Sequence, residues 1–131
     1  MILDTSALLA VILNEPNEAR VAAAMVDAPA LRMSVGNWLE AALVIDARRN
    51  PRAKARFEDL VQELRLELVA VTVEAAYRGR VAHGDYGRGN HPAKLNYGDC
   101  FAYALAKLSG EPLLFTGNDF AQTDVEPALK D

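Results

Sequence analysis

Short apolar runs alternate with longer stretches of helical periodicity along the 131-residue chain, and this alternation limits the possible folds most strongly. Parallel strands need crossover connections, which are usually helices, and those helices then cover both faces of the sheet. The pattern therefore predicts an α/β sandwich around a central, mainly parallel sheet of four to five short strands. The strands are expected at residues 1–3, 30–33, 66–71 and 112–115, with a last one beginning at Val125.

Helices are predicted between these strands from apolar spacing and from residues that start or stop a helix. Ser34, Thr72 and Asn96 are typical N-caps. The glycine-rich segment 84–96 is predicted to be a mobile loop. No repeat or linker divides the sequence, so residues 1–131 are expected to form a single domain. The expected helical ranges, caps included, are 6–13, 16–26, 34–49, 51–64, 72–83 and 96–108.

Composition argues against several classes of protein. With 51% hydrophobic and 24% charged residues, the chain does not resemble a disordered, collagen-like or coiled-coil sequence. Its longest apolar run, residues 7–13, is far shorter than the roughly 20 residues of a membrane-spanning helix, and no basic segment precedes it as in a signal peptide. We therefore expect a cytoplasmic protein. The single Cys100 cannot form an internal disulfide and is expected to be a small buried side chain.

The formal net charge of −4, from 14 basic and 18 acidic residues, argues against binding nucleic acid by overall electrostatics. The basic residues are nevertheless clustered, because residues 48–56 carry five cations and residues 78–94 carry four against the single Asp85. The second cluster is a candidate anion-binding surface, although a solvated surface patch would give the same pattern. Its four members are Arg78, Arg80, Arg88 and Lys94.

Three acidic residues are predicted to lie near strand ends. Asp4 follows the first strand, Asp119 follows the strand at 112–115, and Asp99 stands in the first turn of the helix that begins after Asn96. In open α/β folds, ligands gather beyond the carboxyl ends of the strands. Glu40 differs because it lies inside an apolar helix, which leaves it few ways to reach water.

Four carboxylates in one pocket would repel one another and would be costly to bury while ionised. A bound cation makes such a cluster tolerable, and a set of oxygen ligands selects Mg²⁺ or Mn²⁺. Each acid also has a purely structural interpretation: Asp4 as a helix cap, Asp99 as a complement to the helix dipole, Asp119 as a loop residue, and Glu40 as the partner of a buried arginine. The residues alone leave both interpretations open.

Four segments of the chain occur in a characteristic order. They are Met-Ile-Leu-Asp-Thr-Ser-Ala-Leu at residues 1–8, Leu39 and Glu40 in a helix that ends with Ala47 and Arg48, Leu-Asn-Tyr-Gly-Asp-Cys-Phe-Ala-Tyr-Ala-Leu-Ala-Lys at residues 95–107, and Pro-Leu-Leu-Phe-Thr at residues 112–116. In this order and spacing they resemble the VapC toxins of the PIN-domain family. The resemblance covers nearly the whole chain, and its third segment is the most diagnostic.

The resemblance implies an α/β/α PIN fold, a Mg²⁺- or Mn²⁺-dependent endoribonuclease, and a cognate VapB-type antitoxin that silences it. By position, Asp4, Glu40 and Asp99 match the three main acids of the family. Family members often carry Thr-x-Asp-x-x-Phe at the position of the fourth acid, whereas this chain has Thr-Gly-Asn-Asp-Phe. Asp119 is therefore the expected fourth acid, and Asp124 is the fallback.

Two hydroxyl residues and the basic cluster complete the expected site. Ser6 and Thr116 match small hydroxyl positions that hold a metal-bound water in the family, although either residue would equally serve as a helix or turn cap. The implied reaction is hydrolysis of an RNA phosphodiester by a metal-activated water, with Glu40 as the expected proton acceptor. The four cations of segment 78–94 would offset the repulsion between these acids and RNA.

Different classes of protein also fit parts of the pattern. A strand followed by Asp-x-Ser resembles the haloacid-dehalogenase phosphatases, but Ser6 stands where their second Asp is expected. A ribonuclease that works without metal would depend on His83 and His91. An interaction module that keeps the PIN fold without turnover would retain the acids and lack activity.

The first two helices carry more apolar residues than one sheet-facing stripe requires. The surplus predicts an exposed groove, including Val11 and Met25, that would bind a helix of the antitoxin. The same face would otherwise serve as an interface between two copies of the chain, and a homodimer is expected in either case.

Overall fold

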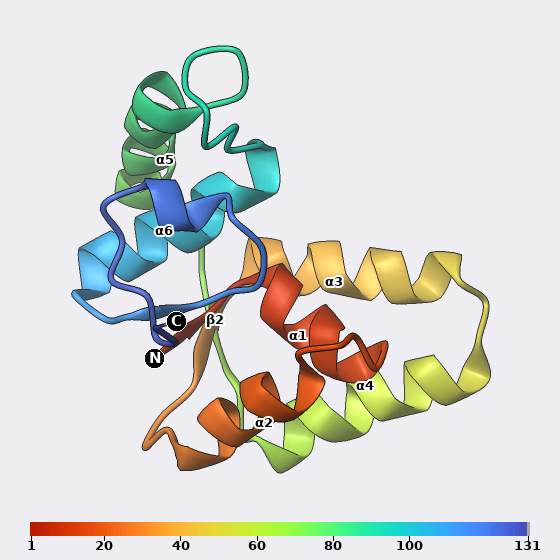
Figure 1. Ribbon diagram of the computed structural model, residues 1–131. Coiled ribbons are helices and arrows are strands. Elements are labelled where there is room, and N and C mark those ends of the chain that lie inside the picture. Colours follow the sequence, from red (N-terminus) through yellow and green to blue (C-terminus); the bar gives the residue numbers. More distant parts are fainter. Residues whose placement is uncertain (131) are drawn as a thin grey trace.

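The structure is a computed structural model that describes residues 1–130 (Figure 1). The strand order of its central sheet is β3-β2-β1-β4, and each neighbouring pair of strands is parallel. The predicted α/β fold with a parallel sheet of short strands is therefore confirmed. The strands are β1 (Ile2–Leu3), β2 (Arg32–Ser34), β3 (Glu67–Val69) and β4 (Leu113–Leu114).

Helices connect the strands and cover the sheet. Helices α3 and α4 form an antiparallel hairpin that projects to the right in Figure 1, whereas α5 and α6 lie together on the other side of the molecule. The helices are α1 (Thr5–Ile12), α2 (Glu18–Asp27), α3 (Val35–Ala47), α4 (Pro51–Glu63), α5 (Val73–Tyr86), α6 (Tyr97–Ser109) and the short 3-10 helix η1 (Phe120–Gln122).

Strands β1 and β4 separate two hydrophobic cores, because alternate residues of a strand face opposite sides of a sheet. Leu3 and Leu114 pack against residues of α1, α2, α3 and α4. Ile2 and Leu113 pack against residues of α5, α6 and η1. All four side chains are completely buried. The sheet is therefore the middle layer of an α/β/α sandwich, as the sequence predicted.

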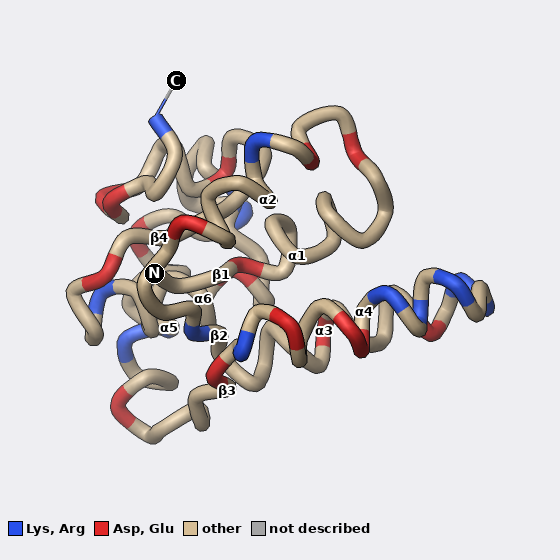
Figure 2. Tube along the Cα trace, turned by 90° about the horizontal axis from the view of Figure 1, so that it is seen from below, with Lys and Arg blue, Asp and Glu red and all other residues tan. Residues whose placement is uncertain are grey.

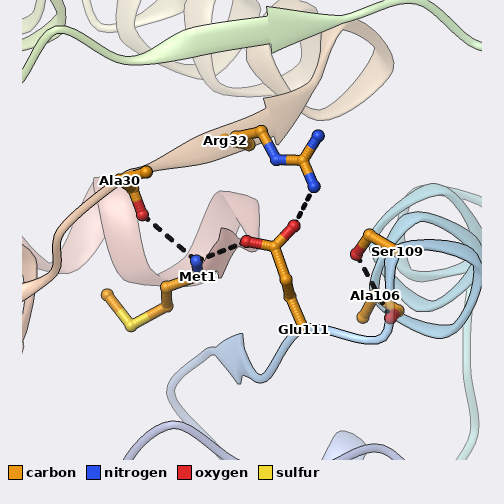
Figure 3. Close-up of polar contacts among 6 residues, drawn as sticks. All are labelled: Met1, Ala30, Arg32, Ala106, Ser109 and Glu111. Carbon is orange, nitrogen blue, oxygen red and sulfur yellow. Dashed lines mark hydrogen bonds and ion pairs between the residues drawn. The ribbon is translucent and has the colours of Figure 1, made fainter.

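A charged network closes the amino ends of the strands (Figure 3). The Met1 amine donates hydrogen bonds to the Ala30 carbonyl at 3.1 Å and to Glu111 Oε1 at 2.7 Å, and Arg32 donates to the other oxygen of Glu111. Burial raises the pKa of Glu111, but the hydrogen bonds from Met1 and Arg32 outweigh burial and hold that pKa below its ordinary value. The acid at this edge of the sheet is thus neutralised by its neighbours.

One helix is longer than predicted. Helix α5 continues to Tyr86 instead of ending near His83, so the irregular segment begins at Gly87. A glycine inside a helix costs about 1 kcal/mol, and Gly84 is the residue that favours an end near His83. Packing of Ala82 and Tyr86 into the core shared with α6 outweighs that cost. The remaining helix and strand boundaries differ from the predicted ones by one or two residues.

In segment 84–96, predicted to be a mobile loop, residues 84–86 belong to α5 and residues 87–96 are held by backbone hydrogen bonds. The amides of Asn90 and His91 both donate to the Gly87 carbonyl, at 2.9 and 3.0 Å, and the Lys94 amide donates to the His91 carbonyl at 3.0 Å. Gly87 also pairs with Leu95 in an isolated β-bridge. The segment is therefore an ordered loop that is closed at its base.

Val125 does not begin a fifth strand. The chain after it approaches the free edge of β4, where the Leu113 amide donates to the Glu126 carbonyl at 2.8 Å and the Ala128 amide donates to the Leu113 carbonyl at 2.9 Å. Pro127 lies between these two hydrogen bonds and forms an isolated bridge with Leu113. The backbone nitrogen of Pro127 points away from β4, so proline is tolerated here because no ladder hydrogen bond depends on its missing N–H. Within residues 1–130, the backbone pairing of this segment with β4 is limited to this bridge.

The predicted groove on the first two helices is wrong, because α1 and α2 bury these residues in the core. Val11 and Met25 are only 3% and 2% exposed. Val26 is the one large apolar residue of α1 and α2 that is exposed, and most of the other large apolar side chains that reach solvent lie on α3, on α5 and at the start of α6. They include Leu39, Leu43, Val44, Val73, Tyr77, Val81 and Tyr97.

The charged residues are also distributed unevenly (Figure 2). The basic residues of segment 48–56 lie around the turn between α3 and α4, at the far end of the hairpin. This position separates them from the end of β1, where the first predicted site residue lies. In residues 1–130, no helix has both the length and the apolarity needed to cross a bilayer.

Because Met25 is buried and Leu43 is exposed, replacing each of them with an acidic residue is expected to have a different effect on stability. Met25→Glu places a charge in the core and is expected to lower the free energy of unfolding by about 3 kcal/mol or more. Leu43→Glu changes a side chain that is 58% exposed, so its effect is expected to stay within about 1 kcal/mol. Urea unfolding of both variants measures the difference. Equal losses of stability would contradict the assignment of Met25 to the core.

Candidate functional site

Asp4 lies at the carboxyl end of β1 and caps α1. Its Oδ2 accepts hydrogen bonds from the Ser6 amide at 3.0 Å and from the Ser6 hydroxyl at 2.6 Å. Its Oδ1 is buried and has no hydrogen-bond partner within the described chain. The structural interpretation of Asp4 as a helix cap is therefore correct, but it accounts for one oxygen only. The second oxygen is available to a ligand.

Ser6 connects this aspartate to the end of β4. The Ser6 hydroxyl donates to Asp4 and accepts a hydrogen bond from the Thr116 amide at 3.1 Å. It therefore fixes the Asp4 carboxylate relative to the neighbouring strand. Thr116 takes part in this contact through its backbone and not through its hydroxyl.

Glu40 reaches the same edge from α3. It is half-buried, and its Oε1 accepts a hydrogen bond from the Thr5 hydroxyl at 2.6 Å. The carboxylate lies against Gly98 at the start of α6, where any Cβ would collide with it. The prediction that Glu40 has few routes to water is only partly right, because Leu39 and Leu43 beside it are exposed.

Two residues that sequence reasoning missed hold α3 and α6 at this edge. Asn37 is completely buried, and its side-chain amide donates to the Gly98 carbonyl at 2.9 Å. The Thr5 hydroxyl also lies 3.1 Å from the Asn37 carbonyl, so it serves Glu40 and Asn37 together. The available signal was a single asparagine three residues before Glu40 on an otherwise apolar helix face. It indicates a buried polar side chain that must find a partner.

Asp99 completes the group from the first turn of α6. Its backbone and side chain form a capping box with Asn96, in which Asp99 Oδ2 accepts from the Asn96 amide at 3.0 Å. Burial is the main reason that the pKa of Asp99 rises to about 7, and the charges of Asp4, Asp119 and Glu40 add to it. Burial likewise raises the pKa of Asp4 to about 6, with a further contribution from Glu40 and in spite of the Ser6 hydrogen bonds.

The fourth acid of this group is Asp119 and not the fallback Asp124. Asp119 is exposed just before η1 and lies close enough to raise the pKa of Asp99. Asp124 instead accepts hydrogen bonds from the Tyr103 hydroxyl at 2.6 Å and from Lys107 at 3.1 Å. Burial alone would raise the pKa of Asp124, but these two donors lower it. Asp124 therefore belongs to a separate structural contact.

The four acids form an electrostatic cluster without a cation of the protein. In residues 1–130, no lysine, arginine or histidine forms an ion pair with Asp4, Glu40, Asp99 or Asp119. The donor set consists of carboxylate oxygens, and the partnerless Asp4 Oδ1 faces no competing donor, which fits a hard divalent cation. As placed, however, no three acidic, histidine or cysteine side chains of residues 1–130 are gathered into a ready-made metal site.

The four predicted anion-binding cations fall into two groups. Arg88 and Lys94 line a cleft of about 640 Å³ that also includes Asp119. Arg80 lines a different, mainly apolar groove with Tyr97 and Phe101. Arg78 lies near the phenol of Tyr103, whose pKa its charge lowers against the larger opposing effect of burial. Only the first pair therefore shares a cavity with a member of the acid cluster.

Cys100 is half-buried, and its thiol donates to the Asn96 carbonyl at 3.2 Å. Burial raises the pKa of this thiol, and the neighbouring charge of Asp99 raises it further. The sequence predicts that Cys100 is buried, but the structure leaves it partly exposed at the start of α6. A thiol held in its protonated form is a poor nucleophile.

Comparisons with known proteins identify the family of this chain. Residues 1–126 match the family model for the PIN domain. Ribonuclease VapC of Mycolicibacterium smegmatis is 44% identical over 125 residues, covering 95% of this chain and 97% of that protein. Ribonuclease VapC30 of Mycobacterium tuberculosis is 47% identical over 126 residues, covering 95% of each.

Two solved structures share the fold. The crystal structure of Mycobacterium tuberculosis VapC20, described as a sarcin-ricin loop cleaving toxin, gives a TM-score of 0.72 at 16% identity over 96% of this chain and 98% of that chain. A toxin–antitoxin complex from Klebsiella pneumoniae gives a TM-score of 0.69 at 19% identity, with 94% and 92% of the two chains covered. This chain therefore belongs to the PIN-domain family. The two sequence relatives named above are both VapC proteins, which confirms the resemblance to the VapC toxins seen in the sequence.

The raised pKa values predict how the stability of the metal-free protein depends on pH. Asp4 and Asp99 bind protons more tightly in the folded protein, where their pKa values are about 6 and 7, than in the unfolded chain, where both lie near 3.8. The free energy of unfolding should therefore fall as the pH rises from 4 to 7, by about 1 to 3 kcal/mol. Asp99→Asn keeps an oxygen for the Asn96 cap and removes one charge, so it should flatten this slope and stabilise the protein at pH 7.

Chemical denaturation at several pH values in the presence of a chelator measures this dependence. Glu58→Gln, an exposed change on α4, is the matched control and should keep the slope of the unchanged protein. A stability that rises between pH 4 and 7, or an Asp99→Asn variant with an unchanged slope, would contradict the crowding of these carboxylates.

Proposed function

We propose that this chain is the toxin of a type II toxin–antitoxin system and acts as a Mg²⁺- or Mn²⁺-dependent endoribonuclease. The observation that carries the proposal is the group of four carboxylates at the carboxyl edge of the sheet, which no cation of the described chain neutralises and in which Asp4 Oδ1 has no partner. The names of the VapC relatives, which are called ribonucleases, give independent support.

Asp4 and Asp99 are the residues proposed to hold the metal directly, since both are fixed by hydrogen bonds through Oδ2 only. Glu40 and Asp119 are proposed to act through water or on a second metal. A divalent metal, when bound, lowers the pKa of the attacking water and balances the negative charge that develops at phosphorus.

The remaining steps fall to the side chains of this chain. Glu40, oriented by the Thr5 hydroxyl, is proposed to accept the proton of the attacking water. The water oxygen bonds to phosphorus while the bond to the 3′-oxygen breaks, and that oxygen takes up a proton as it leaves. The products are therefore a 5′-phosphate and a 3′-hydroxyl. The Ser6 hydroxyl donates to Asp4 and accepts from the Thr116 amide, so it keeps the Asp4 carboxylate in place. Ser6 itself is proposed to take no direct part in the reaction.

Membership of the PIN-domain family leaves no support for a haloacid-dehalogenase phosphatase. A metal-free ribonuclease and an interaction module without turnover each predict a different result with RNA. A metal-free ribonuclease that uses His83 and His91 would leave 2′,3′-cyclic phosphate ends, because the 2′-hydroxyl would then be the nucleophile. An interaction module would leave RNA intact under every condition.

The partners are part of the same proposal. The solved toxin–antitoxin complex with the same fold supports a small cognate antitoxin for this chain as well. We propose that the antitoxin sends a basic side chain into the acid cluster, and that the toxin is a cytoplasmic homodimer.

The metal requirement predicts a clear dependence of RNA cleavage on divalent ions. The purified chain, free of partner, should cut single-stranded RNA with Mg²⁺ or Mn²⁺, lose this activity in a chelator and regain it when metal is restored. Asp99→Asn should lower the rate at least about 100-fold, while Asp124→Asn, the same change outside the cluster, should leave it within about threefold. Mapping of the RNA ends identifies the reaction. Cleavage that persists in a chelator with cyclic phosphate ends would refute the proposed mechanism.

Charge neutralisation by the antitoxin predicts a second result. The product of the adjacent small reading frame should copurify with this chain and suppress cleavage, and Asp119→Asn should weaken the complex by about tenfold, or about 1.4 kcal/mol. Asp124→Asn is the control, since its carboxylate is already paired with Lys107. Calorimetric titration measures both affinities, and equal affinities for the Asp119 variant and the unchanged chain would remove the acid cluster from the interface.

A further inference from the structure

The cleft of about 640 Å³ beside Asp119 has a wall of defined shape, formed by the loop between α5 and α6. Hydrogen bonds from the Arg88 amide to the Leu95 carbonyl and from the Leu95 amide to the Tyr86 carbonyl, both at 3.0 Å, close the loop at its base. A Cβ at Gly87 would collide with the carbonyl of His83, so only glycine fits there. The loop, which stands at the top of Figure 1, therefore presents its side chains from a fixed base.

Two cations of this loop are available to a ligand. Arg88 and Lys94 are exposed, line the cleft, and form no ion pair or side-chain hydrogen bond within residues 1–130. Elsewhere in the described chain, Arg32, Arg56 and Lys107 are each paired with an acid. Lys94 has a φ of 55°, a left-handed conformation that costs a lysine about 1 kcal/mol. A lysine is thus present where the backbone would favour glycine or asparagine.

The cleft leads directly to the acid cluster. Asp119 lines it, and so does Asn96, whose side chain accepts from the Asp99 amide and whose amide donates to the Asp99 carboxylate. The lining of the cleft therefore combines two cations with Asp119 and with Asn96, the hydrogen-bond partner of Asp99. The chain carries a net charge of −4, and these two cations supply local attraction for a polyanion beside acids that would repel it.

We propose that this cleft is a phosphate-binding subsite for single-stranded RNA, in which Arg88 and Lys94 bind backbone phosphates next to the scissile bond. The guanidinium of Arg88 offers paired donors that match phosphate oxygens, and Lys94 adds a point charge. This inference rests on the proposed ribonuclease function. It assigns phosphate binding to two of the four cations of segment 78–94. Arg78 and Arg80 lie outside the cleft and are not members of it.

The test measures binding and does not depend on cleavage. A fluorescent single-stranded oligoribonucleotide is titrated with the full chain in the presence of a chelator, and anisotropy gives the dissociation constant at several salt concentrations. The double variant Arg88→Gln, Lys94→Gln should bind at least about tenfold more weakly in low salt. It should also lower the slope of log affinity against log salt by about 1.4, since each phosphate contact contributes about 0.7 for a single strand.

A second double variant controls for the lost charge. Arg52→Gln, Lys54→Gln removes two cations from the tip of the α3–α4 hairpin and should leave RNA affinity within about twofold. Thermal melts check that both variants fold. An unchanged affinity of the cleft variant, or equal losses in both variants, would overturn the subsite.

The outcome also separates this inference from the proposed function. Weaker RNA binding by the cleft variant, together with no metal-dependent cleavage by the unchanged chain, would support the subsite and refute the enzyme. Metal-dependent cleavage with unchanged RNA binding by the cleft variant would support the enzyme and refute the subsite.

Discussion

Burial of the Asp4 carboxylate is the constraint on which the carboxyl edge of the sheet depends. One oxygen is held by Ser6 and the other has no partner in the described chain, while the charges of Asp4, Glu40 and Asp119 all act on Asp99 at the same edge. At the opposite edge, Met1 and Arg32 neutralise Glu111. The sheet therefore has one end whose charge is balanced internally and one whose carboxylates form no ion pair in residues 1–130. Chemistry is expected at the second end.

The sequence predicted those features of the structure that depend on interactions between residues close together in the chain. The alternation of short apolar runs with helical stretches indicated the parallel sheet, and Asn96 indicated the start of α6 together with the position of Asp99. Asp119 and Asp124 could not be separated in this way. Their difference depends on the Tyr103 and Lys107 side chains of α6, which bind Asp124 across the tertiary structure. The contacts of Asn37 with Gly98 and with Thr5 also depend on the tertiary structure, so the sequence could indicate a buried asparagine but not its partners.

The error about α1 and α2 has a physical explanation. Counting apolar residues shows how much of a helix can be buried, but it does not show how many neighbours surround that helix. Helix α1 packs against the sheet, α2 and the α3–α4 hairpin, so Val11 is buried although it lies outside a single sheet-facing stripe. Helix α3 packs against α1, α4 and α6, but its Leu39 and Leu43 lie on a face that these elements leave open, and they remain exposed. Whether an apolar side chain of this fold is exposed therefore depends on the elements packed around it as much as on its hydrophobicity.

The close approach of Glu40 to Gly98 has a practical consequence. Alanine at position 98 would add a single methyl group where the carboxylate lies, so the glutamate side chain would have to move. The substitution alters no formal charge, and alanine is a better helix former than glycine. Replacement of an aspartate by asparagine always changes the total charge of the acid cluster. Alanine at position 98 changes the geometry of the cluster and leaves its total charge unchanged. A protein altered in this way would keep the electrostatic field that a basic partner meets while misplacing one of the carboxylates.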